Sequence, residues 1–123
     1  MKKLLTITAI LEALTGIALV IAPIHVVQLL LSSPLSENGG IIIAMIGGAA
    51  ILSLAFTCWI FRNNTHSMGI VNLLLFYNSA VLAIATYGMI NYSLSAFGLW
   101  VVVGFHSMMS TWCIVVLAKQ LKS

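Results

Sequence analysis

Four long apolar segments decide what this chain can fold into. They cover residues 4–22, 40–61, 68–90 and 96–118. Each has about 20 residues, the length at which a helix rising about 1.5 Å per residue crosses a hydrocarbon core of about 30 Å. The last three segments contain no Asp, Glu, Lys or Arg. The pattern therefore predicts four transmembrane helices.

The composition leads to the same prediction. Hydrophobic residues make up 62% of the chain and charged residues 6%, whereas a soluble domain carries about 25% charged residues. This number of charged side chains is too small to cover the surface of a globular protein of this size. We therefore expect lipid to surround most of the protein surface. We expect a single transmembrane domain over residues 1–123 that needs no nucleic-acid partner, because the cations flank apolar segments and form no stripe.

A secretory signal peptide is the alternative interpretation of the N-terminus, because Met1, Lys2 and Lys3 precede an apolar run. That run is longer than a signal-peptide core of about 7–15 residues, and it contains Glu12. We interpret it as a retained helix.

The distribution of basic residues predicts the orientation. They lie before the first apolar segment, between the second and third, and after the fourth: Lys2, Lys3, Arg62, Lys119 and Lys122. With four spans these positions share one side of the membrane, and the opposite loops, around 23–39 and 91–95, contain no Lys or Arg. The positive-inside rule therefore places both termini in the cytoplasm. We expect a multi-pass protein of the bacterial inner membrane.

The links predict an all-α fold, an up-down-up-down four-helix bundle. Residues 62–67 and 91–95 are short links, which favour antiparallel packing of the helices that they join. The link over 23–39 is longer and partly apolar, and Pro23 and Pro34 bracket it. We expect a short helix over 24–31 that lies in the outer membrane interface. A plain capping loop is the alternative.

Small residues recur every four positions in the second apolar segment, at Gly40, Ala44 and Gly48. Such spacing lets two helix backbones approach closely in lipid. We expect this face to pack inside the bundle; a homodimer interface is the alternative.

Glu12 is the one acidic residue within the four segments. A carboxylate at that depth must be protonated, partnered or wetted by a cavity. Thr8, Glu12 and Thr15 share a helix face, so the sequence predicts an inward-facing polar stripe. The two hypotheses for Glu12 are a functional site and a neutral carboxylic acid that hydrogen-bonds across helices as structural glue.

Other helices offer polar groups at a compatible depth. Tyr77 and Asn78 fall near the middle of the third segment, and His106 near the middle of the fourth. If these side chains gather around Glu12, they satisfy the acid and form a group able to share a proton. Asn78 and His106 are otherwise ordinary interhelical hydrogen-bond partners.

Several chemistries have no motif in this chain. The sequence contains no Walker loop, no HExxH motif and no Cys/His spacing typical of a metal site. Cys58 and Cys113 are expected to be reduced and buried as small apolar residues. We therefore predict no catalytic residue, no metal site and no cofactor.

Two resemblances rest on these residues. Four helices with Glu12 in the first are similar to the small multidrug resistance transporters. Their tryptophan-containing turn is not found here. Some of those proteins insert in both orientations, which requires almost no bias of basic residues toward one side, whereas the bias here is five to zero. Over nearly the whole chain, the sequence resembles small bacterial four-helix membrane proteins of unknown activity. The shared pieces include Glu12 with Gly16, Cys58-Trp59, Tyr77-Asn78 and His106. This resemblance implies the fold and a polar interior, with no activity to transfer.

The leading functional hypothesis is binding or transport of a small molecule or a proton at a midplane site around Glu12. In this hypothesis Glu12 titrates, His106 shares its proton, and Asn78 with Tyr77 orients the ligand or a water. The alternative is a non-catalytic subunit that packs against a larger membrane complex. A membrane-embedded enzyme is a third class, for which the sequence offers no recognisable catalytic constellation.

Overall fold

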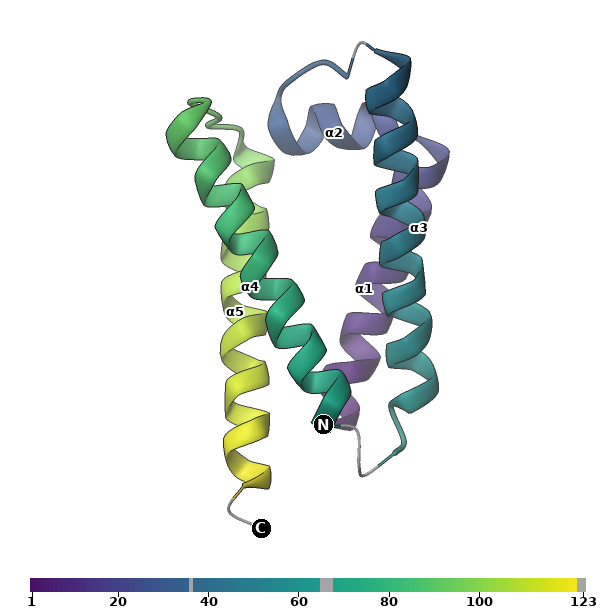
Figure 1. The fold of residues 1–123 in the computed structure, drawn as a ribbon, viewed down its shortest axis with the longest axis vertical. Helices are drawn as coiled ribbons and strands as arrows, with labels where there is room; N and C mark the ends of the chain where they lie inside the picture. The colour runs from purple at the N-terminus through teal and green to yellow at the C-terminus, as the bar shows by residue number, and fades with distance from the viewer. Residues whose placement is uncertain (36, 65–67, 122–123) are drawn as a thin grey trace.

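The computed structural model describes residues 1–35, 37–64 and 68–121, and in these ranges the regular structure is entirely helical. The helices are α1 Lys2–Ile21, α2 Pro23–Leu31, α3 Asn38–Phe61, α4 Met68–Asn91 and α5 Phe97–Gln120 (Figure 1). Lys122 and the end of the link over 62–67 lie outside the described residues.

Four of these helices, α1, α3, α4 and α5, are long and apolar enough to cross a membrane. Their bounds lie within two residues of the four predicted segments. Much of their outer surface is apolar: Phe76 is 74% exposed, Ile84 71% and Ile43 71%. Because such side chains are normally removed from water, a hydrocarbon environment suits this surface. The prediction of four long apolar helices is confirmed.

The predicted short helix is also confirmed, as α2. Pro23 occupies its first turn, where a missing backbone N–H costs nothing. Ser32 ends the helix in the left-handed conformation at φ 50°, and its N–H bonds the carbonyl of Gln28 at 2.8 Å.

The long helices form two pairs, in which α1 packs along α3 and α4 packs along α5. The first pair is closest at Gly16 and Gly48. A Cβ at Gly48 would lie 2.9 Å from the Gly16 carbonyl oxygen, and a Cβ at Gly16 would lie 2.8 Å from the Gly48 oxygen. Gly48 therefore packs inside the bundle, as the small-residue spacing predicts, whereas Gly40 faces Leu35 and Gly47 has nothing within 4 Å.

The two pairs meet near the beginning of α1 and separate toward α2 (Figure 1). All four long helices contribute to one apolar core at the closed end: Leu4, Leu5, Ala9, Cys58, Val71, Leu74, Met109, Cys113 and Val116. Both cysteines in this core are free thiols. At the open end α2 lies across the two pairs, and a Cβ at Gly98 of α5 would overlap the backbone of Leu29 and Leu30.

The pairing differs in one respect from the expectation that short links join packed neighbours. The link over 62–67 connects α3 and α4, and these helices share the core at the closed end but diverge beyond it (Figure 1). Helix α2 packs against α1, α3 and α5 at the other end. It lies between the two pairs there, and the link over 62–67 joins α3 and α4 at the closed end.

Candidate functional site

Buried polar side chains form a layer directly beside the apolar core. Glu12 lies one turn beyond Ala9 in α1, Asn78 one turn beyond Leu74 in α4, and His106 one turn before Met109 in α5. Their side chains are 6%, 1% and 8% exposed, respectively. Glu12 stands ten residues from the beginning of α1, about 15 Å along the helix axis. This distance is half of the thickness of an ordinary hydrocarbon core, about 30 Å.

Glu12 reaches across to the second helix pair. The Tyr77 hydroxyl donates to Oε2 of Glu12 at 3.4 Å, which joins α1 to α4. An O–H···O bond is usually about 2.7–2.8 Å long, so this contact is weak. Glu12 is thus buried and turned inward, but its contact with Tyr77 does not use the full acceptor capacity of a carboxylate.

Asn78 and His106 form the short contact of the layer. Oδ1 of Asn78 lies 2.7 Å from Nδ1 of His106, and Nδ2 of Asn78 donates to the Leu74 carbonyl at 2.7 Å. Because the amide N–H faces Leu74, Oδ1 is the acceptor and Nδ1 of His106 must carry a hydrogen. In the neutral imidazole this leaves Nε2 as the proton acceptor.

Tyr77 connects these two contacts. Its ring meets the His106 ring edge-on, with centroids 5.8 Å apart and planes at 75°. The four candidate site residues form one sequence of contacts from Glu12 through Tyr77 to His106 and Asn78, which the sequence left open.

Two buried hydroxyl groups beside this layer have no hydrogen-bond partner within the described part of the chain. They are Oγ1 of Thr8 and Oγ of Ser110. Thr8 lies one turn from Glu12, and Ser110 one turn from His106, each on the same helix face as its neighbour. Buried polar groups are nearly always satisfied in folded proteins. Thr8 and Ser110 therefore keep unused hydrogen-bonding capacity in this layer.

The predicted inward stripe is wrong at Thr15. Its side chain is exposed, and its hydroxyl donates to the Leu11 carbonyl of its own helix at 2.9 Å. Thr15 shares a helix face with Thr8 and Glu12, but α4 diverges from α1 with distance from the closed end (Figure 1). Ser53 and Thr57 likewise donate to carbonyls of their own helix, α3.

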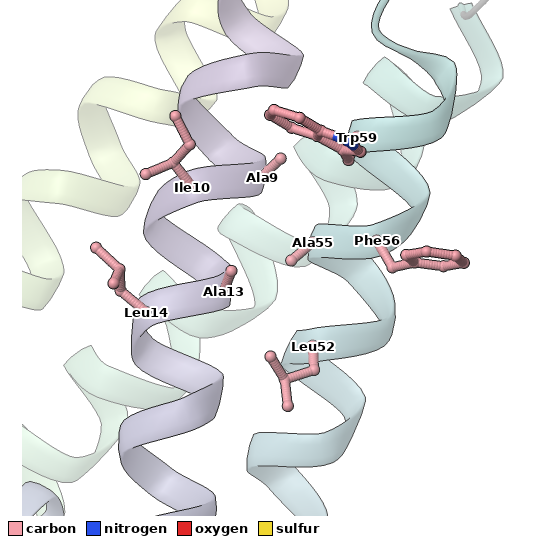
Figure 2. A pocket seen from close by; sticks show the side chains of 8 residues that line it. All are labelled: Ala9, Ile10, Ala13, Leu14, Leu52, Ala55, Phe56 and Trp59. Atoms are coloured by element: carbon pink, nitrogen blue, oxygen red, sulfur yellow. The ribbon is translucent and has the colours of Figure 1, made fainter.

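The structure adds an apolar groove that the sequence reasoning missed. It has a volume of about 570 Å³ and lies between α1 and α3 (Figure 2). Ala9, Ala13 and Ala55 point into it, and Leu52 and Trp59 close it along α3. Glu12 is not among its lining residues. The four-residue spacing of Ala9 and Ala13 was the available signal, but it does not reveal which helix lies opposite.

No group of three or more His, Cys, Asp or Glu side chains in the described ranges is placed to hold a metal ion. Comparisons of the chain with protein-family models, curated proteins and solved structures gave no match. The resemblance to small bacterial four-helix membrane proteins therefore stays a prediction.

Proposed function

We propose that this chain is a multi-pass protein of the bacterial inner membrane, an up-down-up-down bundle with both termini in the cytoplasm and α2 in the outer interface. The four long apolar helices and the five-to-zero distribution of basic residues support this topology.

The topology is tested by labelling single cysteines in a Cys58→Ser, Cys113→Ser background. Ser95→Cys and Lys119→Cys lie at opposite ends of α5. A membrane-impermeant maleimide is expected to label the Ser95→Cys variant in intact spheroplasts. It is expected to label the Lys119→Cys variant only after the spheroplasts are lysed. The reverse pattern contradicts the orientation, and labelling of both without lysis contradicts insertion.

The polar layer is the proposed site, and its function is to bind a proton or a small molecule with hydrogen-bonding groups. The observation that carries this proposal is the buried Glu12 carboxyl, which has a weak contact from Tyr77 and lies one turn from the Thr8 hydroxyl, for which the described residues offer no partner. A purely structural carboxyl group is expected to satisfy its neighbours. This layer instead keeps donor and acceptor capacity for a guest.

In the proposed mechanism Glu12 gains and loses a proton, and His106 shares it. Asn78 fixes a hydrogen on Nδ1 of His106, so Nε2 is the nitrogen that accepts a proton from the site. The resulting imidazolium keeps its Nδ1–H bond to Asn78. Tyr77 contacts both Glu12 and His106 and orients the guest between them.

The chain offers an unusually clean test, because Glu12 and Glu37 are its two acidic residues. Purified protein in detergent is titrated between about pH 4 and 9, and infrared difference spectra follow the carbonyl stretch of a protonated carboxyl group. Glu12→Gln is expected to remove the signal of a carboxyl group that titrates between the helices. The proton of such a buried carboxyl group exchanges slowly with deuterium. Glu37→Gln, at an exposed position, is the matched control and is expected to keep that signal.

The same spectra decide against the proposal if wild type and Glu12→Gln coincide over the whole pH range. The carboxyl group then neither gains nor loses a proton, and the structural role as interhelical glue is the better explanation. Circular dichroism of both variants shows whether the helices persist.

The alternative function is that of a subunit of a larger membrane complex, which would contact its partner through the side of α3 at Gly47. A Cβ added at Gly47 would meet none of the described residues within 4 Å, whereas Gly48 packs against Gly16. This alternative predicts a partner membrane protein that co-purifies with the wild type and is lost from a Gly47→Leu variant. It also predicts that Glu12→Gln has no proton-linked effect.

A further inference from the structure

The groove between α1 and α3 ends at a basic pocket. This second pocket has a volume of about 380 Å³ and is lined by Met1, Lys2, Arg62, Asn63 and Asn64. It lies where α1 begins and α3 ends. The apolar groove begins one turn before Arg62 along α3, at Trp59, and about two turns after Lys2 along α1, at Ala9. The two pockets therefore follow one another along the same pair of helices.

Trp59 and Arg62 join the two pockets. The Arg62 guanidinium carbon lies 3.5 Å from the centroid of the Trp59 ring, and Nη1 donates to the Trp59 carbonyl. This stacking fixes the cation at the mouth of the groove. A guanidinium has five N–H donors, so one bond to Trp59 leaves capacity to bind an oxyanion.

The groove and the basic pocket together are about as long as one leaflet of a bilayer is thick. Arg62 lies ten positions after Leu52, about 15 Å along the helix axis, which is half of a hydrocarbon core of about 30 Å. The floor is made of alanines, which leaves room for a chain of methylene groups between α1 and α3. The basic end carries donors suited to a phosphate.

We propose that this surface is a binding site for one anionic phospholipid, with its phosphate at Lys2 and Arg62 and an acyl chain in the groove along Ala9, Ala13 and Ala55. The two cations favour a lipid with a negatively charged head group, and the apolar floor of the groove favours an acyl chain. The inference rests on the membrane insertion proposed above but not on the protonation of Glu12, which lies outside the groove.

Trp59 can report on its own groove once Trp100→Phe and Trp112→Phe make it the single tryptophan. The protein is reconstituted in phosphatidylcholine vesicles that contain a minor fraction of brominated lipid. Brominated phosphatidylglycerol is expected to quench Trp59 with a higher relative binding constant than brominated phosphatidylcholine, by about fivefold for each cation that faces the phosphate. Equal quenching by the two lipids overturns the proposal.

Matched variants separate this site from general attraction to an anionic surface. Arg62→Gln is expected to lower the preference about fivefold, and Lys119→Gln, which removes an equal charge at the end of α5, to leave it unchanged. Equal losses in both variants mean that no specific site exists. Lys2→Gln repeats the test without disturbing the Trp59 ring.

Two further arms identify the occupant. Ala13→Leu is expected to fill the groove and reduce quenching by both lipids, whereas Ala83→Leu on the exposed side of α4 has no effect.

Added glycerol 3-phosphate is expected not to relieve the quenching, and full relief overturns the lipid in favour of a small-anion site. Glu12→Gln keeps the lipid preference, so failure of this proposal and failure of the proton site are distinguishable. If Ala13→Leu does not fold, the Arg62 and Lys2 variants decide.

Discussion

Oδ1 of Asn78 lies 2.7 Å from Nδ1 of His106 and joins α4 to α5 in the buried polar layer. The same amide is fixed at its other end by the Leu74 carbonyl. The orientation of the Asn78 amide therefore decides which nitrogen of His106 carries a hydrogen. A substitution of Asn78 should change the hydrogen bonding of His106.

We expect Asn78→Leu to lower the free energy of unfolding by about 1–3 kcal/mol, because Nδ1–H of His106 is left buried without an acceptor. Reversible unfolding in mixed micelles of a mild detergent and dodecyl sulfate measures this. The double variant Asn78→Leu, His106→Leu should lose less than the sum of the single variants, with a coupling of about 0.6–1.7 kcal/mol. Additive losses contradict the direct contact.

Tyr77→Phe removes the hydroxyl that faces Glu12. Because that contact is 3.4 Å long, the expected loss of unfolding free energy is below about 1 kcal/mol. The informative effect is spectroscopic: the carboxyl stretch of Glu12 should shift when its donor is removed. Tyr87→Phe, at a residue that is 56% exposed, is the control. An unchanged stretch in Tyr77→Phe shows that the hydroxyl does not contact the acid.

Gly48→Ala should destabilise the fold, since the new Cβ would lie 2.9 Å from both the Gly16 oxygen and Cβ of Leu19. Forcing α1 and α3 apart is expected to cost about 1–3 kcal/mol. Gly47→Ala is the adjacent control and has open space around its Cβ, so it should be neutral or stabilising by up to about 1 kcal/mol. Unfolding in micelles compares the two, and equal losses would refute the close approach.

Gly98→Ala should release α2 from α5, because its Cβ would overlap the backbone of Leu29 and Leu30. We expect faster amide hydrogen exchange over 24–31, measured by mass spectrometry in detergent. Gly104→Ala, in the same helix with nothing within 4 Å, should leave that exchange unchanged. Protection that persists in Gly98→Ala would show that α2 is held by other contacts.

The sequence was sufficient to predict the helices. Segments of apolar residues set their number and nearly their bounds, because helix formation and burial in lipid depend on local composition and length. Pro23 and the apolar residues after it were enough to indicate α2. Glu12 was predicted to turn inward for a similarly local reason, since a carboxyl group facing acyl chains is costly.

The candidate site was predictable in its members but not in its contacts. Tyr77, Asn78 and His106 could be named because each is a polar residue at the depth of Glu12. That Tyr77 meets Glu12 while Asn78 meets His106 depends on the rotation and tilt of α4. Thr15 shows the limit of helix periodicity, because it shares a face with Glu12 and yet is exposed.

By itself, the sequence determined the four long apolar helices, the short helix between the first two, and the polar residues that an apolar environment must bury. The tertiary structure decided which helices pair, where the pairs diverge, and how an alanine-floored groove comes to end at Lys2 and Arg62. The physical reason is that burial in lipid acts on each segment separately, whereas packing depends on close contacts between residues distant in sequence, such as Gly16 and Gly48.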